Sequence, residues 1–107
     1  MEINQKAKDS IIDYVMEKNL KSTLQEMPKR GRYEVEFGYK LCVNEQAPNS
    51  IFVMSEVLGY HNHSLDYSKY RIYEFDLNGK PKNNNYQDSN ACYNGFINDL
   101  KLVQTII

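Results

Sequence analysis

A strict alternation between residues 33 and 43 constrains the fold of this chain more than any other feature. Every second position is apolar or aromatic: Tyr33, Val35, Phe37, Tyr39, Leu41 and Val43. Successive side chains of a strand point to opposite faces, so the pattern predicts a strand with one buried face and one solvent face. We expect these six side chains on the buried face. Glu34 and Glu36 then fall on the solvent face, where they solubilise the sheet rather than transfer protons.

The first segment of the chain has the periodicity of an amphipathic helix over residues 2–18. Its apolar stripe comprises Ile3, Ala7, Ile11, Tyr14 and Val15. The period continues as far as Pro28, but a straight helix of that length would measure ~39 Å and overhang a domain with a radius of gyration of ~13 Å. We therefore expect a break or a bend near Asn19, which tolerates the left-handed conformation that ends helices.

Two further strands are predicted, over Ser50–Leu58 and Lys69–Leu77, with a polar turn over Gly59–Ser64 between them. Asn78-Gly79 is a strong signal for a tight reversal. The residues that follow, 80–85, form either a short edge strand blunted by Pro and Lys or a loop.

The last segment, residues 88–107, is compatible with two structures. A helical stripe runs through Tyr93, Phe96, Ile97, Leu100, Val103 and Ile107. Asn94-Gly95 and the β-branched ending indicate a hairpin instead. We favour the helix. The chain is thus expected to form a single α+β domain over residues 1–107, in which an N-terminal helix packs on an antiparallel three- to four-stranded meander and a C-terminal helix follows.

Charge and hydropathy exclude several classes of function. The net charge is −1, so no global field attracts nucleic acid or an anionic membrane. The longest apolar run, Ile51–Met54, is far shorter than the ~20 residues of a membrane-spanning helix. The first residues contain no apolar segment of the kind that directs secretion. We expect a cytoplasmic protein that binds neither nucleic acid nor membrane.

No pattern of residues indicates a catalytic, cofactor or metal site. His61 and His63 share one side of an extended segment, but no third ligand stands at a motif spacing, so metal binding by this pair stays open. Cys42 and Cys92 lack the local signature of a nucleophile, and we interpret them as buried small side chains. We predict no catalytic residues, no cofactor and no metal ligands, and the sequence favours a protein that is not an enzyme.

The remaining signal is the density of tyrosine in the second half of the chain. Aromatic side chains, and Tyr in particular, are enriched where proteins bind one another. The candidate partner-binding residues are Tyr60, Tyr67, Tyr70, Tyr73 and Tyr86.

Our hypothesis is a small protein-interaction module, an inhibitor, an immunity-type protein or an adaptor, that binds a protein partner through a Tyr-rich surface of sheet and loops. A bare edge strand would also allow a homodimer. The alternative is a small-ligand-binding or minor enzymatic domain. It would have a cone of the kind found in cystatin-like and NTF2-like folds, with a pocket lined by aromatic residues of the sheet.

Overall fold

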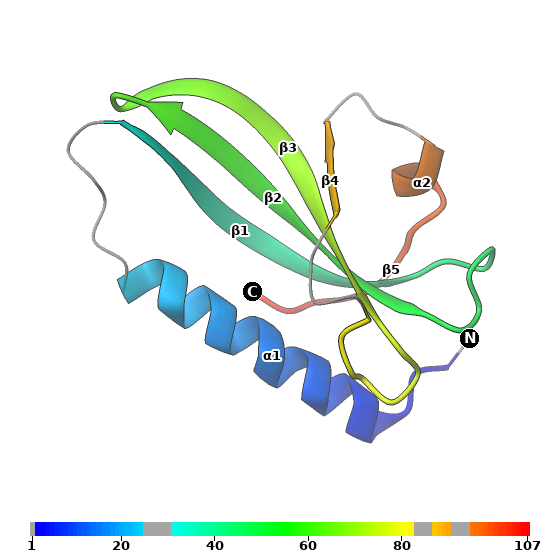
Figure 1. The fold of residues 1–107 in the computed structure, drawn as a ribbon. Coiled ribbons are helices and arrows are strands. Elements are labelled where there is room, and N and C mark those ends of the chain that lie inside the picture. The colour runs from blue at the N-terminus through cyan, green and yellow to red at the C-terminus, as the bar shows by residue number, and fades with distance from the viewer. Residues whose placement is uncertain (1, 25–30, 83–86, 91–94) are drawn as a thin grey trace.

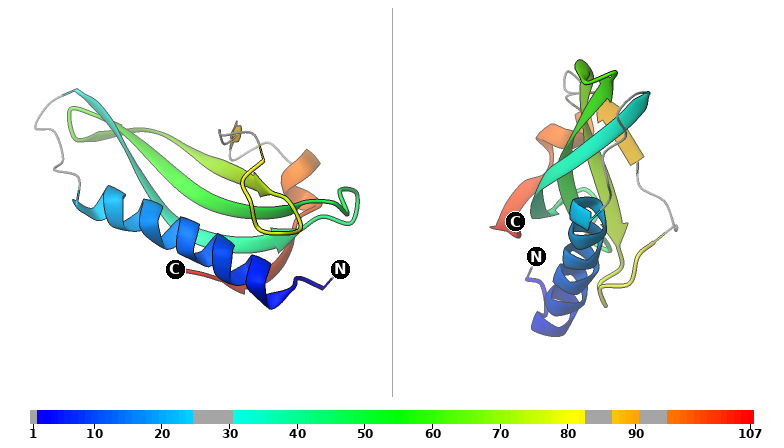
Figure 2. Two further views of the ribbon diagram at one scale, coloured as in Figure 1. Left: turned by 60° about the horizontal axis from the view of Figure 1, so that its bottom comes forward. Right: turned by 90° about the vertical axis from the view of Figure 1, so that its left-hand side faces the viewer.

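One long helix lies along one side of a twisted antiparallel sheet (Figures 1 and 2). The computed structural model describes residues 2–24, 31–82, 87–90 and 95–107. Its elements are α1 (Gln5–Leu24), β1 (Arg32–Val43), β2 (Ile51–His61), β3 (Ser64–Phe75), β4 (Gln87–Asn90), α2 (Gly95–Asn98) and β5 (Lys101–Thr105). The strand order is β4-β3-β2-β1-β5. The α+β class is therefore confirmed, and β1 to β3 form the antiparallel meander that the sequence predicts. Strand β4 extends this meander, but it lies beyond the residues 80–85 considered for a fourth strand.

Helix α1 begins at an N-cap formed by Asn4, whose side-chain oxygen accepts a hydrogen bond from the Ala7 amide at 3.0 Å. The helix continues through Asn19 to Leu24, so the predicted break is wrong. That prediction assumed a compact body, whereas the domain measures 44 × 29 × 23 Å. The strands β1, β2 and β3, of 11 or 12 residues, make the sheet long enough for a helix of ~30 Å to run beside it.

The hairpin between β2 and β3 is tighter than the sequence predicts. His61 lies opposite Ser64, and only Asn62 and His63 connect the strands, with φ angles of 50° and 68°. Two consecutive left-handed residues are typical of the type I′ turns that match the twist of a hairpin. The expected six-residue turn over 59–64 is therefore wrong, and both strands extend to the tip of the hairpin.

Strand β1 contains a bulge that divides it into two halves. Phe37 lies opposite Glu56, but Lys40 lies opposite Met54, so β1 uses three steps where β2 uses two. The extra residue is accommodated at Gly38, whose φ of +68° is in the left-handed region. Because an inserted residue exchanges the faces, Glu36 and Leu41 point to the same side of the sheet.

The bulge contradicts the expectation that all six apolar residues of β1 share one face. Tyr39 and Leu41 are fully buried on the helix-facing side. Phe37, which precedes the bulge, points to the opposite side of the sheet and is 41% exposed. Glu36 replaces it on the helix-facing side, where its side chain is only 14% exposed.

The main core lies between the first half of α1 and the half of the sheet that follows the bulge. Its buried members are Ala7, Ile11, Val15, Tyr39, Leu41, Ile51, Val53, Tyr73 and Phe75. The ring of Tyr14 meets the rings of Tyr73 and Phe75 edge to face, with centroids 6.4 and 5.4 Å apart. Beyond Val15 the apolar stripe of the helix is partly in solvent, and Leu20 is 57% exposed.

The end of the chain differs from the predicted helix. Among the described residues of this segment only Gly95–Asn98 is helical, and Lys101–Thr105 forms strand β5, which pairs with Lys40–Val43 of β1. A second, smaller core on the opposite face joins Cys42, Phe52 and Ile72 to Ile97 and Leu100. The prediction of a helix fails because residues 101–105 pair along the free side of β1, which satisfies their backbone hydrogen-bonding groups. β-branched side chains favour this extended conformation.

The Asn78-Gly79 signal does mark a reversal, but the returning strand is minimal. The Asp76 amide donates to the Lys80 carbonyl at 2.8 Å, and the Gly79 amide donates to the Asp76 carbonyl at 3.0 Å. An isolated bridge between Phe75 and Pro81 follows. Of the two forms left open for residues 80–85, the described residues 80–82 make only this bridge, and residues 83–85 lie outside the described residues.

The bulge predicts unequal effects of two substitutions at Gly38. A Cβ atom there would stand 3.3 Å from a carboxylate oxygen of Glu56, and a β-branched residue resists the left-handed conformation. We expect Gly38→Val to lower the free energy of unfolding by about 1–3 kcal/mol in urea titrations. Gly38→Asn should cost clearly less, because Asn adopts this conformation more readily. Equal losses for the two variants would show that Gly38 is not held at positive φ.

Candidate functional site

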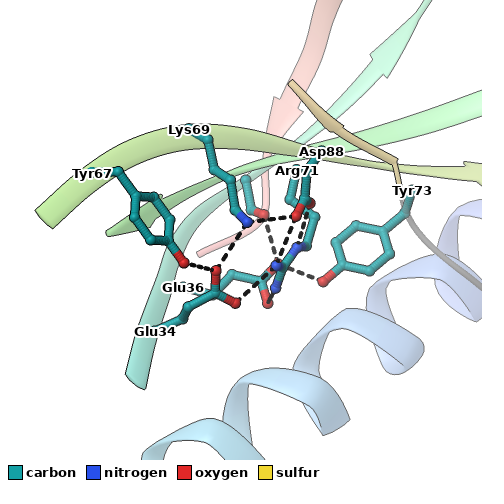
Figure 3. Close-up of polar contacts among 8 residues, drawn as sticks. Glu34, Glu36, Tyr67, Lys69, Arg71, Tyr73 and Asp88 are labelled. Carbon is teal, nitrogen blue, oxygen red and sulfur yellow. Dashed lines mark hydrogen bonds and ion pairs between the residues drawn. The ribbon is translucent and has the colours of Figure 1, made fainter. Parts of the chain in front are cut away.

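On the helix-facing side of the sheet, the part before the bulge is charged, whereas the part after it is apolar. Figure 3 shows the charged side chains. Five charged side chains from three strands form one ion network, comprising Glu34 and Glu36 of β1, Lys69 and Arg71 of β3, and Asp88 of β4. The register brings them together, because Glu36 lies opposite Val57, and Val57 lies opposite Lys69. Arg71 in turn lies opposite Asp88 on the edge strand β4.

Arg71 is the centre of the ion network and is only 8% exposed. Its guanidinium donates to both carboxylate oxygens of Asp88, from Nε at 2.8 Å and from Nη2 at 3.2 Å. Nη2 also donates to Glu34 at 3.0 Å, and Nη1 lies 3.6 Å from Glu36. A planar guanidinium suits such multiple pairing, which an ammonium group could not reproduce.

Lys69 pairs with two of the same carboxylates as Arg71 and is more exposed than Arg71. Its Nζ lies 2.7 Å from Asp88 and 3.0 Å from Glu34, and 5.0 Å from the centre of the Tyr67 ring. The Tyr67 hydroxyl donates to Glu34. The ring of Tyr67 can reach across to β1 because Gly59 lies between them: a Cβ atom on Gly59 would stand 2.1 Å from the ring. A glycine is therefore required on the middle strand at this point.

Glu36 accepts hydrogen bonds from hydroxyl groups as well as pairing with Arg71. Ser55 donates at 2.6 Å and Tyr73 at 2.5 Å. The hydroxyl of the fully buried Tyr39 lies near the same carboxylate, and burial together with Glu36 raises its pKa well above the usual value. That hydroxyl nevertheless makes no geometrically acceptable hydrogen bond. It is thus a buried polar atom without a partner, which native proteins usually avoid.

Two acids of the ion network, Glu34 and Asp88, ionise more readily than free side chains. Burial alone would raise the pKa of Glu34, but hydrogen bonds from Tyr67, Lys69 and Arg71 outweigh it and lower that pKa below its usual value. Asp88 behaves in the same way through Arg71 and Lys69. Burial would lower the pKa of Arg71, but Asp88 and Glu34 raise it. These groups remain charged at neutral pH, which suits ion pairing better than proton transfer.

The predicted partner-binding tyrosines do not lie on one surface. Tyr73 is 4% exposed in the main core, and Tyr67 lies on the helix-facing side with its hydroxyl on Glu34. Tyr60 and Tyr70 are on the opposite face, paired with Tyr33 and Glu56. Tyr86 lies outside the described residues.

The interpretation of Glu36 as a solvent-facing charge is wrong, whereas Glu34 is exposed as expected but belongs to the ion network. Lys69, Arg71 and Asp88 were not predicted as a site. The bulge, which alternation alone does not show, inverts the face of both glutamates. A signal for the partners does exist, because Lys69 and Arg71 stand two residues apart on β3, between Tyr67 and Tyr73. Cations at that spacing share a face with each other and can meet acids at the same spacing on a neighbouring strand.

His63 and Cys42 each have a structural environment in the described residues. The Nδ1 atom of His63 lies 3.2 Å from the Tyr33 hydroxyl at the tip of the hairpin. Within the described parts of the chain, no three His, Cys, Asp or Glu side chains are grouped as a metal site requires. Cys42 is buried, as interpreted, and desolvation raises the pKa of its thiol to about 11, so it is a poor nucleophile. Cys92 lies outside the described residues.

Comparison with known proteins does not identify a family for this chain. No protein-family model, curated protein or solved structure matches the chain. Of the helices that the structure describes, none is both long and apolar enough to cross a lipid bilayer. Function must therefore be inferred from the chemistry of the surfaces described above.

Removing Arg71 should destabilise the fold far more than removing an exposed cation. Arg71→Met leaves Glu34, Glu36 and Asp88 without their shared partner, and we expect a loss of about 2–4 kcal/mol in urea unfolding. The matched control is Lys101→Met, which breaks the exposed pair with Glu45 and should leave the unfolding free energy nearly unchanged. Similar losses for both variants would show that the ion network is not an important source of stability.

The ion network also predicts a loss of stability in acid. The pKa values of Glu34 and Asp88 in the folded chain are below their ordinary values of 4.5 and 3.8. The two carboxylates therefore make their full contribution to the free energy of unfolding when the pH is above their ordinary pKa values. That contribution is lost as the pH falls through their lowered pKa values in the folded chain. The free energy of unfolding should fall as the pH drops below about 5. Arg71→Met should reduce this slope, since it removes a cause of both shifts. An unchanged slope in that variant would rule out Arg71 as the source of the acid sensitivity.

Proposed function

We propose that this protein is a small protein-interaction module that binds a protein partner through the sheet face opposite α1. The observation that carries the proposal is the outward position of Phe37. The bulge at Gly38 turns this large aromatic side chain away from the core, and it remains 41% exposed. Exposed aromatic groups on a rigid sheet are typical of binding surfaces.

Phe37 belongs to a larger patch on that face. We define the far-face surface as Tyr33, Val35, Phe37, Leu58, Tyr60 and Tyr70. The rings of Tyr33 and Tyr60 stack with centroids 5.2 Å apart and planes inclined by 13°. Val35 lies opposite Leu58, and both are half-buried. The patch therefore offers pre-ordered aromatic and aliphatic groups, which reduces the entropy lost on binding.

The structure favours a subset of the predicted tyrosines for this role. Tyr60 and Tyr70 lie on the far-face surface, whereas Tyr67 and Tyr73 donate their hydroxyl groups to the ion network. The Tyr73 ring also packs in the main core, and the Tyr67 ring lies beside the ammonium group of Lys69. An inhibitor, an immunity-type protein or an adaptor would act in this way, by occupying the surface of its partner without chemical change.

A second candidate function is binding of a small polar ligand on the helix-facing side. The unpartnered hydroxyl of Tyr39, beside Glu36 and close to Tyr73, favours it. A ligand with a hydrogen-bond acceptor would satisfy that buried hydroxyl. This is the alternative of a cone between helix and sheet, with the aromatic residues of the sheet as its lining.

Site-specific photocrosslinking tests the first proposal. A benzophenone amino acid replaces Phe37 in one variant and Leu77 in the control, because Leu77 is 43% exposed but lies in a turn beyond β3. In cells that produce the protein naturally, position 37 should yield a discrete crosslinked protein and position 77 should not. Phe37→Ser should then weaken binding of the identified partner by at least about tenfold, while Leu77→Ser should not.

Two results would contradict the proposal. One is the same crosslinked products from both positions, and the other is unchanged affinity in Phe37→Ser. The second candidate has a separate readout, since a ligand that binds beside Tyr39 should raise the melting temperature of the wild type but not of Tyr39→Phe.

A further inference from the structure

The two edges of the sheet differ sharply in chemistry. Strand β4 has only four residues, all of them polar, and its Asp88 is tied to Arg71 of β3. Strand β5 and the residues after it expose apolar side chains instead, because Leu102, Val103 and Ile107 are 59%, 43% and 42% exposed. Natural sheets usually protect an edge with short length, charge or proline, because an open edge templates pairing with another chain. Only β4 has these protections.

The unprotected part of the edge runs from Leu102 to Ile107. It contains no charged residue and no proline. The one cation of β5, Lys101, is paired with Glu45 at the start of the strand. The far end is held in place, because the amides of Ile106 and Ile107 both donate to the Tyr39 carbonyl, at 2.8 and 3.5 Å. The edge is thus fixed along β1 and presents a row of backbone groups outward.

We propose that β5 pairs antiparallel with β5 of a second copy of this chain, so that the two sheets join into one. A two-fold axis between the two copies of β5 places these strands antiparallel. Each strand then supplies backbone donors and acceptors to the free edge of the other. The uncharged stretch from 102 to 107 sets no like charges against one another across the axis. The chain carries a net charge of only −1, so long-range repulsion between copies is weak.

The bulge in β5 determines which part of the edge can pair regularly. Leu41 lies opposite Gln104, but Cys42 lies opposite Leu102, so Val103 is the additional residue. Regular pairing is therefore expected to centre on Gln104 and Thr105, beside the bulge, with Leu102 contributing side-chain contact at the end of the ladder. The far-face surface lies on a face of the sheet rather than at this edge, so the two proposals can fail separately.

Sedimentation equilibrium with two lysine variants tests this assembly. The wild type should form a dimer whose dissociation constant can be fitted over a concentration series. Leu102→Lys should weaken it by at least about tenfold, because a charge then stands on the edge of each copy. The matched control is Leu65→Lys, which changes a residue that is 61% exposed near the tip of the hairpin and should leave the dimer intact. Circular dichroism establishes that both variants fold.

Disulfide trapping gives an independent readout of the same pairing. In a Cys92→Ser background, residues 103, 104 and 105 are changed to Cys one at a time. Under antiparallel pairing, identical positions near the two-fold axis meet, and at least one variant should form an interchain disulfide under mild oxidation. A monomer at every concentration, a dimer unaffected by Leu102→Lys, or failure of all three cysteines to crosslink would overturn the proposal. A dimer broken by Phe37→Ser instead would assign the contact to the far-face surface.

Discussion

The bulge at Gly38 determines which side of the sheet every residue of β1 occupies. Before it, Glu34 and Glu36 face α1; after it, Tyr39 and Leu41 do. One inserted residue therefore divides the helix-facing side into a charged half and an apolar half. The same insertion turns Phe37 outward, so the ion network around the buried Arg71 and the exposed aromatic patch have a single geometric origin.

The two halves of the sheet are stabilised by different interactions. After the bulge, burial of large apolar side chains against α1 is the main contribution, and the edge-to-face rings of Tyr14 and Phe75 add to it. Before the bulge, α1 offers a partly exposed Leu20, and the charged side chains satisfy one another instead. Arg71 links β3 to two other strands. Its partner Asp88 lies on β4, and its partner Glu34 lies on β1, on the far side of β2.

Local patterns were sufficient to predict the elements up to β3 and their antiparallel order, but not the register of β1 or the elements that follow β3. Alternation identified β1 and the burial of Leu41, yet it could not reveal a one-residue insertion, although a glycine inside a strand is a known mark of one. The predicted helix within residues 88–107 failed because residues 101–105 fit both periods, and their partner, Lys40–Val43, lies far away in the sequence. Asp88 could not be predicted for the same reason, since only pairing of β4 with β3 brings it to Arg71.

Cross-strand nuclear Overhauser contacts between β1 and β2 in solution test the bulge most directly. The structure predicts that Phe37 lies opposite Glu56 and that Lys40 lies opposite Met54, with Leu41 opposite Val53. An unbroken ladder would instead place Lys40 opposite Val53. That result would move Glu36 and Leu41 to different faces, and the ion network and the outward position of Phe37 could not coexist with the buried Leu41.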